Sequence, residues 1–132
     1  METIFYRTDD VFAMLILVLA KGRKQGITFN LFFETQERCD DFSRMLWNSG
    51  SALPHGLFVD QFYEMQPILV LMQDQYEENM HKDCAFFIEC EAKLNLKQWQ
   101  KVCYVNDAAY EYKQAENVWE YIGGKWQTLA KK

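Results

Sequence analysis

The sequence predicts an α/β protein: a single three-layer domain in which helices cover both faces of a mostly parallel, five-stranded sheet. Strand-length runs of β-branched and aromatic residues alternate with helix-length segments along the chain, an order that favours parallel strands joined by right-handed crossovers. The 132 residues are enough for one domain with a substantial core. No internal repeat or low-complexity segment interrupts them, so we expect residues 1–132 to form one domain.

The first strand and the first helix are indicated by a change of pattern near residue 8. Residues 3–6 have the composition of a short strand, and Thr8-Asp9-Asp10 places acidic side chains at the start of a helix. The helix contains the apolar run 11–20 and ends in the cationic segment 21–24, where positive charge stabilises the negative end of the helix dipole. Because this helix is apolar almost all round, we expect it to be covered on most sides.

The next strand and helix follow directly. Residues 27–33 (ITFNLFF) have little polar interruption, which is typical of a central strand buried on both faces. Thr35 is placed to cap a helix that runs to Trp47.

Five further elements are expected in the second half of the chain. They are strands at 67–71, 85–88 and 102–105, a short helix at 95–100 capped by Asn95, and a last helix from residue 106 or 107 to about 122. The last helix is indicated by an apolar stripe at helical spacing, formed by Tyr112, Ala115, Trp119 and Ile122, and by Gly123-Gly124 as its stop. This pattern places Trp119 in the core.

The end of the second predicted helix shows a possible docking surface. With about 100° per residue, the apolar side chains of Cys39, Phe42, Met45 and Leu46 fall on one side of this helix. Trp47 falls about 125° from the middle of that stripe by the same step. An apolar loop stiffened by proline, residues 53–57, follows shortly afterwards. A large aromatic side chain that points away from the core beside such a loop favours partner binding over catalysis.

Charge and hydropathy argue against two classes of function. The net charge is −5, and affinity for nucleic acid depends on clustered Lys and Arg. The apolar run at 11–20 is shorter than the ~20 residues that span a bilayer. Asp9 and Asp10 precede it, where a signal peptide carries positive charge. We expect a cytoplasmic protein without membrane or direct nucleic-acid contact.

Metal and nucleotide chemistry find little support in the motifs. Cys39, Cys84, Cys90 and Cys103 form no C-x-x-C pair, and zinc sites need closely spaced ligands. The turn after the first predicted strand, residues 6–10, has no glycine and contains two carboxylates that would repel a pyrophosphate. We therefore expect four buried thiols, no metal and no cofactor.

His55 is the one candidate for acid–base catalysis, because His81 lies in a polar segment where solvation is expected. A general base needs a neighbouring nucleophile or orienting carboxylate. Ser49, Ser51 and Asp60 are near His55 in sequence, but their spacing does not match a nucleophile elbow. We interpret His55 as hydrogen-bonded to loop backbone and predict no catalytic residues.

Several short segments together resemble a known family. They are Phe5-Tyr6 in the first strand, Gly26 before the second strand and Glu34 after it, Ala52-Leu53-Pro54-His55-Gly56-Leu57 after the helix ending Leu46-Trp47, Gln66-Pro67-Ile68-Leu69, and the helix start Asn95-Leu96. Their order and spacing resemble the chi subunit of bacterial DNA polymerase III, a small accessory protein of the clamp loader. The resemblance spans nearly the whole chain and implies a non-catalytic adaptor.

The resemblance also implies two partners. The first is the psi subunit of the clamp loader or an equivalent, held by Trp47, Leu53, Pro54 and Leu57 with His55 beside them. The second is the acidic C-terminal tail of single-stranded-DNA-binding protein, which relatives grip with basic and aromatic residues near the C-terminus. Here the expected last helix has Glu111, Glu116 and Glu120 against Lys113 alone. Lys125 and Trp126 are then the substitutes, or Lys131 and Lys132.

Two other functions stay open at this point. One is a small α/β nucleotide-binding domain or enzyme that uses His55 and a carboxylate. The other is an interaction domain for an unrelated partner at the Trp47 surface, and Trp47 itself could alternatively lie flat over Leu53-Pro54 within the chain.

Overall fold

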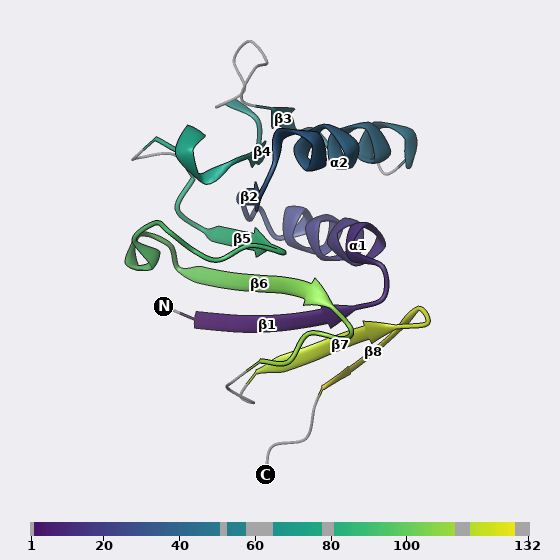
Figure 1. Cartoon of the computed structure of the whole chain (residues 1–132). Coiled ribbons are helices and arrows are strands. Elements are labelled where there is room, and N and C mark those ends of the chain that lie inside the picture. The colour runs from purple at the N-terminus through teal and green to yellow at the C-terminus, as the bar shows by residue number, and fades with distance from the viewer. Residues whose placement is uncertain (1, 51–52, 58–64, 78–80, 113–116, 129–132) are drawn as a thin grey trace.

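The computed structural model describes residues 2–50, 53–57, 65–77, 81–112 and 117–128, which form one mixed sheet with two α-helices beside it (Figure 1). In chain order the elements are β1 (Glu2–Thr8), α1 (Val11–Lys24), β2 (Phe29–Phe33), α2 (Gln36–Asn48), β3 (Gly56–Leu57), β4 (Ile68–Leu71), the 3-10 turn η2 (Gln73–Gln75), β5 (Cys84–Ile88), the 3-10 turn η3 (Leu96–Gln98), β6 (Lys101–Asp107), β7 (Val118–Ile122) and β8 (Lys125–Thr128).

The sheet has the strand order β3-β4-β2-β5-β6-β1-β7-β8, and all its pairs are parallel except β7 with β8. The chain moves from β1 across to β2 and to β3 at the edge, and then returns through β4, β5 and β6. Right-handed crossovers that run in opposite directions lie on opposite faces of a sheet. Both α-helices therefore cover one face, and the described residues of the β4–β5 and β5–β6 connections pack on the other (Figure 1).

The predicted start of each α-helix is confirmed. The carboxylate of Asp10 accepts a hydrogen bond from the backbone N–H of Ala13 at 3.1 Å, and the Thr35 hydroxyl accepts one from that of Arg38 at 3.2 Å. These caps satisfy N–H groups that the first helical turn leaves without a carbonyl partner. α1 ends at Lys24 as predicted, and α2 ends at Asn48, one residue beyond the prediction.

The core on the helix face joins both helices to the strands. It contains Met14, Leu15 and Leu19 of α1, Cys39, Phe42 and Leu46 of α2, and buried side chains of five strands that include Leu31, Ile68, Phe86 and Cys103. The prediction that α1 would be covered on most sides is confirmed, because most of its apolar side chains are buried or partly buried. Leu17 is exposed.

The opposite face contains a row of aromatic rings that crosses four adjacent strands. Phe32 of β2 pairs with Phe87 of β5, Phe87 with Tyr104 of β6, and Tyr104 with Phe5 of β1. Neighbouring rings stack with centroid distances of 5.1, 5.7 and 5.5 Å. Trp99 packs over the Phe32 end of the row at 5.7 Å. Paired aromatics on one face stabilise a sheet by direct cross-strand contact.

Four sequence predictions about the fold are wrong. Among the described residues the sheet has eight strands, not five, and the α-helices lie on one face, since the helix expected at 95–100 is reduced to η3. The last predicted helix is replaced, over the described residues 117–128, by the hairpin β7–β8. Trp119 is accordingly 39% exposed, and not part of the core.

Gly123-Gly124 form the turn of this hairpin and not the predicted helix stop. Ile122 pairs with Lys125 across a two-residue turn in which Gly123 and Gly124 have φ of 60° and 78°. A type I′ turn requires positive φ at both central residues, which glycine adopts without steric cost.

Replacing Gly22 by alanine is predicted to destabilise the protein. A Cβ at this position would overlap the ring of Phe29, with Phe29 Cε2 only 2.8 Å away, and that ring is buried in the core. Overpacking of this kind costs about 1–3 kcal/mol, against a gain of about 1 kcal/mol in helix propensity. Urea unfolding should show a net loss for Gly22→Ala and a change below about 0.5 kcal/mol for the exposed neighbour Lys21→Ala. A more stable Gly22→Ala protein would contradict this packing.

Candidate partner-binding surfaces

Trp47 lies at the end of α2 with its side chain turned away from the core. Its exposed fraction is 66%, whereas Cys39, Phe42 and Leu46 of the same helix are buried. The helical angle calculated from the sequence is therefore confirmed. Its ring contacts that of His55, at a centroid distance of 4.5 Å. Trp47 thus contacts the loop after α2 through His55, and most of its side chain remains exposed.

His55 is buried beneath Trp47, and both of its ring nitrogens have partners. Nδ1 lies 3.1 Å from the carbonyl oxygen of Leu53, and Nε2 lies 2.8 Å from the hydroxyl of Ser43 on α2. Because a carbonyl only accepts, Nδ1 donates, and in the neutral ring Nε2 accepts from Ser43. The interpretation of His55 as a loop-fixing residue is confirmed. An acid–base role would require it to give up one of these two contacts.

The remaining predicted residues of this surface differ in exposure. Pro54 is exposed, but Leu53 is only 8% exposed and packs within the core. Leu57 is partly buried in the short strand β3, where it pairs with Val70 of β4. The exposed residues Trp47 and Pro54, with His55 beneath them, are called the Trp47 surface from here on. Leu53 holds His55 through its backbone carbonyl.

The second predicted site falls on β8, where Lys125 and Trp126 are adjacent. Adjacent residues of a strand point to opposite faces of the sheet, so the two side chains cannot hold one ligand from the same side. Trp126 packs on the helix face against Tyr121 and Tyr6, with centroid distances of 4.9 and 5.9 Å. Lys113 and the pair at 131–132 lie outside the described residues.

Trp126 instead lines a groove between α1 and the hairpin, with a volume of about 770 Å³. Leu17 and Lys21 of α1 and Trp119 of β7 line the same groove, and all three are exposed. We call it the hairpin groove. Sequence reasoning missed Lys21 and Trp119, because no sequence signal places α1 next to a hairpin that was expected to be a helix.

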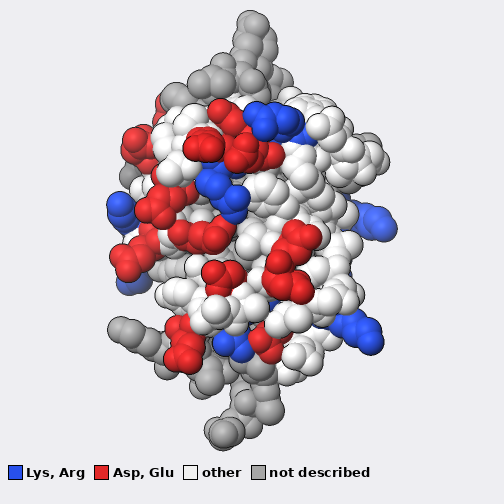
Figure 2. All heavy atoms as spheres, turned by 45° about the vertical axis from the view of Figure 1, so that its right-hand side comes forward, with Lys and Arg blue, Asp and Glu red and all other residues white. Residues whose placement is uncertain are grey.

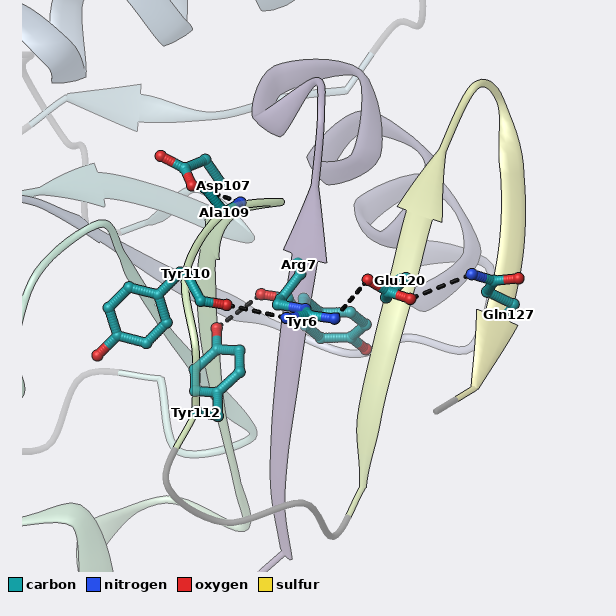
Figure 3. A network of polar contacts seen from close by, with 8 residues as sticks. All are labelled: Tyr6, Arg7, Asp107, Ala109, Tyr110, Tyr112, Glu120 and Gln127. Atoms are coloured by element: carbon teal, nitrogen blue, oxygen red, sulfur yellow. Dashed lines mark hydrogen bonds and ion pairs between the residues drawn. The ribbon is translucent and has the colours of Figure 1, made fainter. Parts of the chain in front are cut away.

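A polar network attaches the hairpin to the rest of the sheet (Figure 3). Arg7 of β1 donates from Nη2 to Glu120 Oε2 at 2.7 Å and from Nη1 to the carbonyl of Tyr110 at 3.1 Å. Gln127 of β8 donates to the other carboxylate oxygen of Glu120 at 3.1 Å. The Arg7 and Glu120 side chains are 20% and 9% exposed, so this ion pair is largely shielded from water.

The other chemically active side chains serve the fold. His81 was expected to be solvated, but it is half-buried and contacts the carbonyl of Gln66 through Nε2. The backbone carbonyl of His81 accepts from the Trp99 indole at 3.2 Å. Burial raises the pKa of the Cys39 thiol to about 12 and that of the Cys90 thiol to about 11. Thiols protonated at neutral pH are poor nucleophiles.

The described residues contain no cluster of three or more His, Cys, Asp or Glu side chains that could hold a metal ion. No helix among them has the length and apolar character needed to cross a bilayer. All four cysteines are free thiols, three of them buried and Cys90 half-buried.

Fold and surfaces together define a small, mostly parallel α/β protein whose described residues include exposed aromatic side chains at the Trp47 surface and at the hairpin groove. The family model of the DNA polymerase III chi subunit, HolC, matches residues 1–123 of the 132 in the chain. The protein therefore belongs to the DNA polymerase III chi subunit family, as the sequence resemblance predicted, and this makes it a subunit of the DNA replication machinery. Neither the curated proteins nor the solved structures contain a match.

Glu120→Gln is predicted to loosen the hairpin. The substitution removes the charge that Arg7 faces in a largely shielded pair, and breaking such a pair costs about 1–3 kcal/mol at this partial exposure. Hydrogen exchange should accelerate in residues 118–128 more than elsewhere.

The matched control is Glu89→Gln, which breaks the ion pair with Arg38, whose two side chains are about 40% exposed. A pair this exposed contributes less than about 1 kcal/mol. Equal destabilisation by both substitutions would contradict the role of Arg7–Glu120.

Proposed function

We propose that this protein is a non-catalytic adaptor within the DNA polymerase III clamp-loader complex. In this proposal the Trp47 surface holds the psi subunit or its equivalent, and the hairpin groove holds the acidic tail of single-stranded-DNA-binding protein. The single observation that carries the proposal is a tryptophan with 66% of its side chain exposed, on a rigid helix of a protein of this family. We further propose that the chain works as one cytoplasmic domain without a cofactor.

The composition and support of the Trp47 surface favour a protein partner. Exposed tryptophans beside apolar side chains are the usual centres of binding energy in protein interfaces. The ring of His55 lies against Trp47 and is itself fixed by Ser43 and the Leu53 carbonyl. A side chain held in place before binding loses less conformational entropy when the partner docks.

The hairpin groove has the chemistry that an acidic, hydrophobic tail requires. Trp119, Trp126 and Leu17 offer apolar contact, and Lys21 offers a cation that forms no ion pair with another described residue. A carboxylate at the end of a peptide is bound by cations within hydrogen-bonding distance. This assignment replaces Lys125 by Lys21, since Lys125 projects from the other face of β8. Lys101 also lines the groove but lies 3.7 Å from Glu2.

An adaptor of this kind acts by coupling two binding events on one body. With the clamp loader at one surface and the protein that coats single strands at the other, the second event becomes effectively intramolecular. No bond is made or broken, which fits the hydrogen-bonded state of His55 and the protonated thiols.

The alternative, a small nucleotide-binding domain or enzyme that uses His55, is tested by thermal denaturation with a panel of nucleotides. A ligand that binds the folded state raises the melting temperature. We expect no rise, because the turn after β1 carries Asp9 and Asp10 where a phosphate would sit. Stabilisation by a nucleotide would favour the enzyme.

Trp47→Ala is predicted to weaken binding of the psi subunit by about 30-fold, or about 2 kcal/mol, because the aromatic anchor is lost. Folding should be unchanged, since the indole is mostly exposed. Isothermal titration with purified psi measures the effect. Leu17→Ala is the control, an exposed apolar residue on the hairpin groove. Equal affinities for the native protein and Trp47→Ala would exclude this surface.

Lys21→Glu and Trp126→Ala are each predicted to weaken a peptide of the single-stranded-DNA-binding protein tail about tenfold, because the first reverses the pairing charge and the second removes the apolar contact. Both should leave psi affinity unchanged. Lys125→Glu changes the charge equally on the opposite face and should have the smaller effect. A larger loss with Lys125→Glu than with Lys21→Glu would reject the hairpin groove in favour of the other face of β8.

A further inference from the structure

We infer that a third surface, on the sheet face opposite the helices, binds an arginine-bearing basic peptide segment of a partner protein. The surface is a cleft of about 970 Å³ that lies between residues 72–74, 89–93 and 110–112. We call it the acidic cleft. It uses none of the residues of the Trp47 surface or the hairpin groove, so this inference stands independently of the proposed function.

The floor of the acidic cleft is the uncovered half of the aromatic row. Phe32 and Phe87 are fully buried, but Tyr104 and Phe5, at the other end of the row, are only partly buried and line the cleft. Tyr112 packs on Phe5 with a centroid distance of 4.8 Å. The strands of a parallel sheet are normally covered on both faces. Here the covering segments leave ring faces open in the middle of the sheet.

Tyr110 extends the aromatic floor toward solvent. Its ring lies 4.9 Å from that of Tyr112, and 47% of its side chain is exposed. Its backbone carbonyl accepts from Arg7 and its amide donates to the Asp107 carbonyl at 3.0 Å, which fixes the segment that carries it. An exposed aromatic ring on an anchored backbone is suited to contact with a ligand.

The rim of the cleft carries negative charge that the described residues do not neutralise. Glu34, Asp74, Glu91 and Glu111 line it, are exposed and form no ion pair with another described residue. Glu89 also lines it and pairs with Arg38. Lys93 is the one Lys or Arg in the described lining. Figure 2 shows acidic side chains gathered across the left and centre of the side where the strands end.

Aromatic faces ringed by carboxylates match the guanidinium group more closely than other ligands. Arginine stacks on aromatic rings and pairs with carboxylates through several donors at once. Phosphates and nucleic acid would be repelled by the rim. The volume is at the upper end of the range of about 300–1,000 Å³ for small-molecule pockets. It therefore suits a segment of several residues better than a single small cation.

The test uses a short fluorescein-labelled peptide of alternating Arg and Ser, titrated with the full chain and followed by fluorescence anisotropy at physiological salt. We expect saturable binding that the matching citrulline peptide does not show, because citrulline keeps the shape and lacks the charge. Glu91→Lys should weaken binding about tenfold by placing a cation on the rim. Tyr110→Ala should weaken it about two- to fivefold by removing one cation–π contact.

Glu37→Lys is the matched control, because it changes the net charge equally at an exposed position of α2 that does not line the cleft. Equal weakening by Glu37→Lys and Glu91→Lys would overturn the inference. A peptide that does not bind would also overturn it, and so would a bound peptide that spermidine displaces at equal charge. Loss of binding in Trp47→Ala would also overturn it, since the peptide would then sit on the Trp47 surface, and would leave the proposed adaptor role intact. All the substituted side chains are exposed, and circular dichroism confirms that each variant folds.

Discussion

The structure depends on one constraint: a parallel sheet has to be covered on both faces, and the described chain supplies α-helices for only one of them. On the other face, stacked rings on β2, β5, β6 and β1 take over part of the covering role, with Trp99 over one end. Cover made of short 3-10 turns and extended segments is thinner than a helix layer. The acidic cleft above Tyr104 and Phe5 is the place where this thinner cover leaves the sheet open.

The exposed aromatic side chains rest on rigid elements that are held by polar contacts. Trp47 is at the end of a capped helix and leans on a histidine with two hydrogen bonds. Trp126 is on a hairpin that Arg7 ties to β1 through Glu120. In both cases an apolar side chain is partly exposed to water, on an element that polar contacts hold in place. Exposed apolar surface of this kind is typical of sites where proteins bind partners.

The sequence predicted those features that depend on local geometry. A step of about 100° per residue suffices to aim Trp47 away from the core, and capping chemistry suffices to start both helices at Asp10 and Thr35. The hairpin was missed because Trp119 and Ile122 also fit a helical stripe, and Gly123-Gly124 fits both a helix stop and a type I′ turn. Which one forms is decided by the pairing of β7 with β1, a contact between distant segments. The place of Lys21 in the hairpin groove and the acidic cleft could not be predicted for the same reason, because both depend on contacts between distant segments.

The placement of the three surfaces bears on how they could work together. The hairpin groove and the acidic cleft lie on opposite faces of the sheet, and the Trp47 surface lies at the end of α2, beside β3 at the far edge. None shares a lining side chain with another, and binding free energies at separated sites on a stiff body add without interaction. Coupling by conformational change would need an element with two arrangements that each ligand prefers differently. In the proposed function the partners are therefore linked by proximity, through surfaces that the described residues of one hydrogen-bonded sheet and the helix beside it hold apart.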